Sequence, residues 1–180
     1  MDRWRRGSLW IVVLGLALVV GASAQTAIPN LSGTTFAGAK VRLPDALAGK
    51  AGVLVVGFSQ GSRDEVTVWG KRLAEDYFDS PAVVFYAMPV LAGAPGFMRG
   101  FIAGRIKAAV SERGRVHFLP IYEDEAGWRA ACAYSPTHAD DAYVLLVDSS
   151  GQVVWKTQGP ASDAVYEALR GKLEALRKGR

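Results

Sequence analysis

The chain is 180 residues long, carries 21 Lys and Arg against 17 Asp and Glu, and has a formal net charge of +4. That length fits one domain with a hydrophobic core of its own, and so small an excess of positive charge gives no case for nucleic-acid binding. The single cysteine, Cys132, excludes an internal disulfide, so the stability of the fold must come from packing.

The first residues read as an export signal. Three arginines precede an apolar run over 9–20, and Ala22-Ser23-Ala24 places small residues before a cleavage site. The run is shorter than the roughly 18–20 residues that cross a bilayer, so a cleaved signal is favoured over the alternative, a retained anchor. We predict an exported, periplasmic or extracellular protein with a signal peptide at 1–24, a leader at 25–32 and one domain at 33–180. Cleavage would lower the formal net charge from +4 to +2, because the signal carries three Arg and one Asp.

The first half of the domain alternates extended and helical segments. Residues 33–43 predict a hairpin around a glycine turn, and 44–47 a helical turn. The nearly all-apolar runs 52–58 and 83–88 predict strands that are buried on both faces. Between these strands, apolar residues recur on one stripe of a helix over 62–78, with a serine at its N-terminus as the cap.

The second half continues the alternation. Residues 97–110 predict the most strongly amphipathic helix of the chain, and 116–122 an extended piece that Pro120 interrupts. A short helix over 125–134, a hairpin of strands 143–147 and 152–157, and a closing helix over 162–177 follow. Because strand–helix–strand units make right-handed parallel crossovers, the predicted fold class is α/β. It is a mixed sheet with helices on both faces and an N-terminal β-hairpin extension.

Two stretches resemble the thioredoxin-like superfamily. Residues 36–58 resemble the opening of peroxiredoxins and exported thioredoxin-like proteins, and 143–155 resembles the superfamily's terminal hairpin. Within it, Val56-Gly57-Phe58-Ser59 before a helix with Trp69, and Met88-Pro89-Val90, are most similar to the mitochondrial ATP-synthase assembly factors and their bacterial relatives. That resemblance implies a protein client, a membrane-sector subunit that the protein helps to assemble.

The residues that carry thiol chemistry in this superfamily are missing. Redox-active members place a nucleophilic cysteine where the central strand meets its helix, but here the junction reads Ser59-Gln60-Gly61-Ser62-Arg63-Asp64. The superfamily's cis-proline before the late strand is also missing, because Asp140-Asp141-Ala142 stands there. Neither Ser59 nor Ser62 has a recognisable base, so a serine at the junction is interpreted as a helix cap. Both absences favour a non-catalytic protein without a cofactor.

Three further side chains, Cys132, His138 and His117, carry groups that could react or bind a metal. Cys132 follows Trp128 by four residues and is interpreted as a small buried hydrophobe. The alternative is a reactive thiol, which would make the protein a divergent peroxiredoxin-like or thiol-transfer enzyme. His138 is interpreted as a solvated loop residue and His117 as a packed or edge-facing strand residue, so we expect no metal site.

The candidate protein-binding residues lie in two places. Gln60, Gly61 and Arg63 belong to the junction, and Arg99 and Arg105 to the basic helix. Such charges usually solvate the outer face of a helix, and the functional alternative is contact with an acidic client or with acidic lipid headgroups. We expect a non-catalytic binding or assembly factor for a membrane-associated protein complex, with membrane-surface contact through the basic helix.

Overall fold

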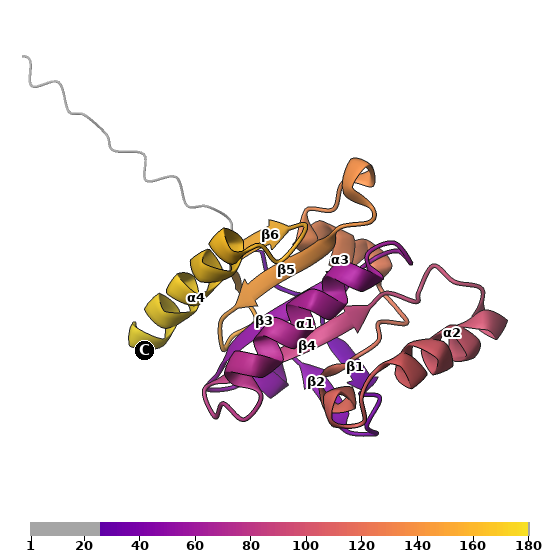
Figure 1. Cartoon of the computed structure of the whole chain (residues 1–180), viewed down its shortest axis with the longest axis horizontal. Coiled ribbons are helices and arrows are strands. Elements are labelled where there is room, and N and C mark those ends of the chain that lie inside the picture. Colours follow the sequence, from indigo (N-terminus) through magenta and orange to yellow (C-terminus); the bar gives the residue numbers. More distant parts are fainter. Residues whose placement is uncertain (1–25, 180) are drawn as a thin grey trace, which may run out of the picture.

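A four-stranded mixed sheet forms the centre of the protein (Figure 1). The computed structural model describes residues 26–179, so the predicted signal peptide lies outside the described residues. The strands are β3 (Ala51–Gly57), β4 (Val83–Pro89), β5 (Ala142–Val147) and β6 (Val153–Gln158). Their order is β4-β3-β5-β6, with β3 parallel to β4 and β5 antiparallel to both β3 and β6. This arrangement confirms the predicted fold class.

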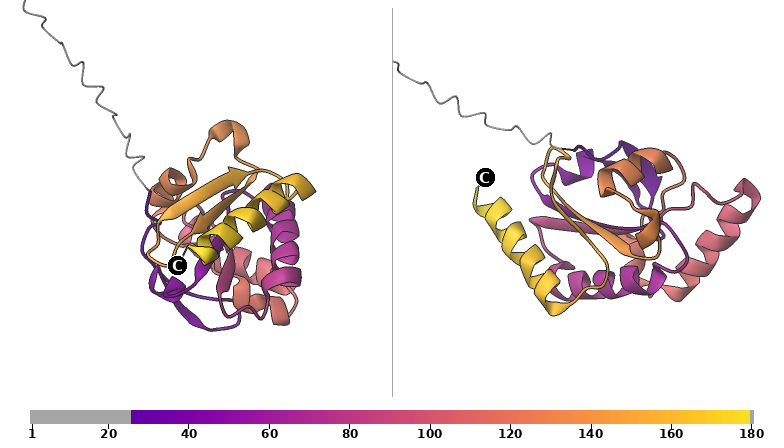
Figure 2. Two further views of the ribbon diagram at one scale, coloured as in Figure 1. Left: turned by 90° about the vertical axis from the view of Figure 1, so that its left-hand side faces the viewer. Right: turned by 90° about the horizontal axis from the view of Figure 1, so that it is seen from above.

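Helices cover both faces of the sheet because its central strands are apolar on both sides (Figure 2). On one face, α1 (Arg63–Tyr77) and α4 (Asp163–Lys178) bury Trp69, Leu73 and Leu169 against β3, β4 and β5. The opposite face is covered by three elements, namely α3 (Glu125–Cys132), the hairpin β1 (Leu31–Thr34) and β2 (Lys40–Leu43), and the 3-10 turn Asp45–Leu47. The sheet is therefore the middle layer of three.

Part of the predicted leader is paired with the domain. The Ile28 amide donates to the carbonyl of Gly151 at 2.9 Å, and the Val153 amide donates to the carbonyl of Thr26 at 2.8 Å. The Ile28 side chain is buried in the core beside the hairpin. Thr26 and Ile28 of the predicted leader therefore pair with residues at the turn between β5 and β6, and Leu31 and Ser32, at the end of the leader, belong to β1.

The helix α2 (Gly96–Ala109) confirms the predicted helix but does not bury its apolar stripe. None of its residues is buried, and Phe97 and Phe101 are 88% and 64% exposed. In Figures 1 and 2, α2 stands at the edge of the molecule beside β4 rather than over the sheet. After α2 a 3-10 helix (Arg113–His117) comes first, and then Phe118 and Ile121 make isolated parallel bridges to Ala87 and Val90. The extended piece predicted over 116–122 is therefore correct only from Phe118, and the prediction that His117 lies in a strand is wrong. Within residues 26–179, no helix is long and apolar enough to span a membrane.

Candidate functional site

The turn between β3 and α1, residues 59–62, is held by its two serines. The Ser62 amide donates to Ser59 Oγ at 3.1 Å, and Ser62 Oγ donates to the Ser59 carbonyl at 2.9 Å. Ser62 stands at the N-cap position but its side chain makes no capping bond, so the predicted role of Ser62 is wrong. Instead, the Ser59 hydroxyl oxygen accepts the hydrogen bond from the Ser62 amide. We call this turn, together with Arg63 at the start of α1, the junction turn (residues 59–63).

The carboxylate of Asp140, 81 positions later in the chain, holds the junction turn in place. Ser59 Oγ donates to Asp140 Oδ1 at 2.6 Å, a short hydrogen bond of the charge-assisted kind. Gly61 lies against the same side chain, because a Cβ there would come under 3.0 Å from Asp140 Cβ and Cγ. Only a residue without a side chain fits beside this carboxylate. The junction turn and the segment before β5 therefore hold each other in place.

A second carboxylate fixes the start of β5. The Ala142 amide donates to Glu65 Oε2 of α1 at 2.8 Å. His138 Nδ1 lies 2.8 Å from Asp141 Oδ2, and the Tyr143 hydroxyl donates to the His138 carbonyl at 3.1 Å. A proline at position 142 would have no amide to give Glu65. Within residues 26–179 the only cis peptide bond is Leu43-Pro44, so the structure has no cis-proline before β5, as the sequence indicates.

Aromatic side chains gather next to the junction turn. The Phe58 ring contacts Tyr134 and Tyr143 edge-on, with ring centroids 5.0 and 5.5 Å apart. The Arg129 guanidinium lies 4.1 Å from the Tyr134 ring centroid and pairs with Glu125 at 2.6 Å. Phe58, Tyr134 and Arg129 are half-buried, so part of each faces solvent. Sequence reasoning missed this cluster, because its members come from three separate elements and share no periodicity.

The structure separates the predicted binding residues into two groups. Gln60, Gly61 and Arg63 are exposed together on the junction turn, and Arg63 makes only a solvent-exposed pair with Asp64 at 3.6 Å. Arg105 is exposed on α2.

Arg99, the other predicted residue of α2, is largely occupied by the backbone. Its guanidinium donates to the carbonyls of Ala92 at 2.6 Å and Ala94 at 2.9 Å, and lies 3.4 Å from the carbonyl of Tyr122. These bonds fix the loop that leads into α2. The position shows a structural role for Arg99 that the sequence pattern did not predict.

The one thiol is protected. Cys132 is 4% exposed at the end of α3, in the core cluster with Trp128 and Tyr143. Burial raises the pKa of the Cys132 thiol to about 12, although the nearby Lys156 lowers it slightly. The thiolate, which is the reactive form, is therefore scarce at neutral pH. The predicted packing role of Cys132 agrees with this environment.

The two histidines have different surroundings. His117 stacks on Phe85, with ring centroids 3.9 Å apart, and its Nδ1 lies 3.1 Å from the Phe85 carbonyl. Burial lowers the pKa of His117 below its ordinary value. His138 is exposed, as expected. In the described part of the chain, no three His, Cys, Asp or Glu side chains are grouped closely enough to hold a metal ion.

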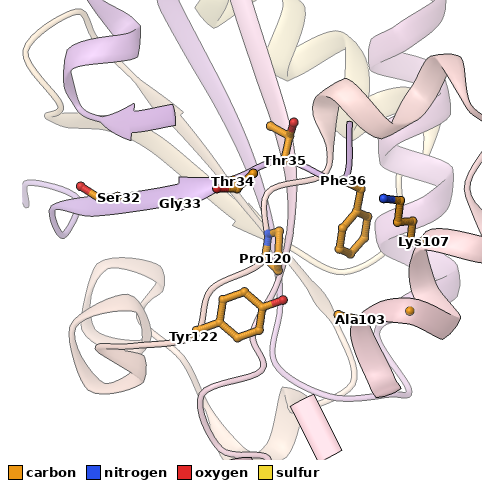
Figure 3. A pocket seen from close by; sticks show the side chains of 10 residues that line it. Ser32, Gly33, Thr34, Thr35, Phe36, Ala103, Lys107, Pro120 and Tyr122 are labelled. Atoms are coloured by element: carbon orange, nitrogen blue, oxygen red, sulfur yellow. The ribbon is translucent and has the colours of Figure 1, made fainter. Parts of the chain in front are cut away.

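A shallow groove lies between β1 and α2 (Figure 3). It has a volume of about 410 Å³, and Phe36, Lys107, Pro120 and Tyr122 are among the residues that line it. The groove is open to solvent, unlike an enclosed site for a small substrate. It separates α2 from the hairpin and leaves that side of α2 free of core contacts.

Comparison with known proteins places the fold. No known family profile and no curated protein matches the chain. Solved structures do match, including a conserved protein from Geobacillus kaustophilus at 20% identity and TM-score 0.56, over 87% of this chain and 82% of that one. A putative thiol:disulfide interchange protein DsbE from Chlorobium tepidum matches at 16% identity and TM-score 0.59, over 84% and 96%. BsSco, a member of the Sco family of cytochrome c oxidase assembly proteins, matches at 13% identity and TM-score 0.58, over 87% and 96%.

These likenesses show that the chain has a thioredoxin-like α/β fold. They show the architecture that thiol–disulfide oxidoreductases use, with the identities too low to carry an activity across. None of the findings singles out the ATP-synthase assembly factors within this fold.

Proposed function

We propose that the protein is an exported, non-catalytic thioredoxin-like protein that binds a protein client and assists assembly of a membrane-associated complex. The junction turn carries the argument. Its two serines stand at the spacing of a Cys-X-X-Cys motif, at the helix N-terminus where a thiolate would be stabilised. Serine keeps the shape of cysteine but cannot form a disulfide, and its hydroxyls are already used within the turn.

The turn is built for recognition rather than for nucleophilic attack. Ser59 Oγ donates its proton to a carboxylate at 2.6 Å, but activation of a serine needs a base that is oriented for proton transfer to and from a substrate. Asp140 is exposed, and within residues 26–179 the hydrogen bond from Ser59 is the one its side chain makes, so no third group in that range orients it as in a triad. What remains accessible is a rigid edge with Gln60, Arg63 and the Phe58–Tyr134 aromatic pair. A rigid surface loses little conformational entropy when it binds.

The assembly role draws on two likenesses. BsSco is described as belonging to a family of cytochrome c oxidase assembly proteins, so the fold has a precedent for assembly work. The sequence resemblance to ATP-synthase assembly factors names a membrane-sector subunit as a candidate client. The alternative enzyme would depend on Cys132, and the burial of this thiol gives that hypothesis no support.

Site-specific crosslinking in the native cell tests the proposal. A photo-crosslinking residue at Gln60 should capture a subunit of a membrane complex, whereas the same residue at Lys172 on α4 should not, because that exposed position lies away from the junction turn. Crosslinks that are equal at both positions, or that contain no membrane-complex subunit, would contradict the proposal. Cys132→Ala should leave the crosslink unchanged; its loss would support the thiol-based alternative.

A further inference from the structure

The helix α2 presents large apolar side chains to solvent. Phe97 is 88% exposed, Phe101 64% and Met98 40%. Gly100 and Gly104 adjoin the phenylalanines, and a Cβ built on either would find nothing within 4 Å. Single exposed apolar residues are ordinary on protein surfaces, but a cluster on a helix that buries none of its residues marks a contact surface. We call Phe97, Gly100, Phe101 and Gly104 the open face of α2.

Contacts on the rest of the helix hold the open face outward. Arg99 anchors the first turn through the carbonyls of Ala92 and Ala94, and Arg115 Nε donates to the Lys107 carbonyl near the last turn at 3.3 Å. A helix rotated to bury its phenylalanines would break these bonds. Exposure of the open face is therefore part of the folded structure.

The charged residues of α2 itself have one sign. Within Gly96–Ala109 the helix carries Arg99, Arg105 and Lys107 and no acidic residue. Arg105 lies beside Phe101, with its guanidinium 5.9 Å from the ring centroid. On the other side of the face Lys107 lines the groove with Gly104. An apolar strip between flanking cations is the pattern of a helix that lies in a membrane surface, where long basic side chains reach the headgroups.

We propose that α2 docks on an anionic phospholipid membrane, with Phe97 and Phe101 among the acyl chains and Arg105 and Lys107 at the level of the headgroups. Charge complementarity selects this occupant, because a second copy of α2 would bring cation against cation without an acidic partner. The inference goes beyond the proposed function, since it concerns another surface and holds whether or not the junction turn binds a client.

A fluorophore on the open face tests docking in the full chain. Ala108 is exposed and falls eleven residues after Phe97, on the same stripe of the helix. An environment-sensitive label on Ala108→Cys reports local insertion, and the buried Cys132 stays unlabelled. The same label on Ala175→Cys of α4 is the control for insertion elsewhere in the chain. The vesicles contain phosphatidylglycerol with phosphatidylcholine, or phosphatidylcholine alone.

We expect the emission at position 108, and not at 175, to report an apolar environment on phosphatidylglycerol vesicles. Phe97→Ser with Phe101→Ser should weaken this binding roughly a hundredfold, since each buried phenylalanine contributes about tenfold or more. Arg105→Gln with Lys107→Gln should weaken it about thirtyfold and reduce its salt dependence. Val68→Ser, a matched loss of an apolar side chain that is 48% exposed on α1, should change nothing.

Several outcomes would overturn the inference. One is an equal response on vesicles of phosphatidylcholine alone, and another is a response at 108 that survives removal of both phenylalanines. A change at 108 that follows protein concentration without lipid would assign the open face to a second copy. Silence at 108 on every vesicle would refute membrane docking outright. None of these results would bear on the Gln60 crosslink, so the two proposals fail separately.

Discussion

The contact between Gly61 and Asp140 makes a quantitative prediction about the junction turn. A Cβ at position 61 would come under 3.0 Å from the Asp140 side chain, so in Gly61→Ala that carboxylate must move. Its movement breaks the hydrogen bond with Ser59. A hydrogen bond to a charged group is worth about 1.5–3 kcal/mol, and solvent at this exposed site reduces it to about 1 kcal/mol. Gly61→Ala should therefore lower the free energy of unfolding by about 1 kcal/mol.

Removal of the obstructing side chain should reverse that effect. Gly61 does not have a positive φ, so alanine is compatible with its backbone and should stabilise by about 0.5 kcal/mol through the unfolded state once Asp140→Gly clears the space. The double-mutant cycle then has a coupling energy of about 1.5 kcal/mol. The four proteins are compared by guanidinium denaturation, with Ser59→Ala as the control that removes the bond without a steric change. Costs that add within about 0.4 kcal/mol would refute the contact.

Three further predictions concern Cys132, His117 and the two serines. Cys132 should resist thiol reagents at neutral pH until the protein is denatured, because its pKa is raised to about 12; equal rates of modification in native and unfolded protein would contradict this. The pKa of folded His117 lies below the ordinary 6.5, so the unfolded state binds more protons as the pH falls below about 6.5 and the free energy of unfolding must decrease. His117→Phe should lose that part of the decrease between about pH 7 and pH 5, as measured by denaturation at each pH; an unchanged slope would exclude His117 as its source. Ser59→Cys with Ser62→Cys should form a disulfide across the turn, detected by alkylation and mass spectrometry; two free thiols under mild oxidation would show that the turn lacks the required geometry.

The sheet could be predicted from the sequence because each strand has a recognisable local pattern of residues. The runs that became β3 and β4 are almost wholly apolar, which only a strand buried on both faces tolerates at that length. The hairpin β5–β6 adds a turn signal at Gly151, whose positive φ favours glycine. Chain order and the crossover rule then predicted that β3 and β4 are parallel and that the late hairpin joins the same sheet.

The hydrogen bonds that hold the site together could not be predicted, because they join residues far apart in the chain. Ser59 and Asp140 are 81 positions apart, and Glu65 and Ala142 are 77 apart. Nothing in the local pattern of any of these four residues indicates its partner. The open face of α2 shows a related limit: periodicity tells which side chains share a face, but not whether the rest of the protein covers that face.

The absence of cysteines at the junction turn is only half of what distinguishes this protein from thiol–disulfide oxidoreductases of similar fold. Thiol–disulfide exchange requires that a second thiol reach the sulfur on this turn. A side chain bonded over the turn would block that approach. Here Ser59 is bonded to Asp140, and Gly61 leaves room for that carboxylate. The start of β5 is also held by Glu65 through the Ala142 amide, which a proline could not offer. These contacts hold the junction turn and the start of β5 in place, and a preorganised surface of this kind is what the proposed binding of a client requires.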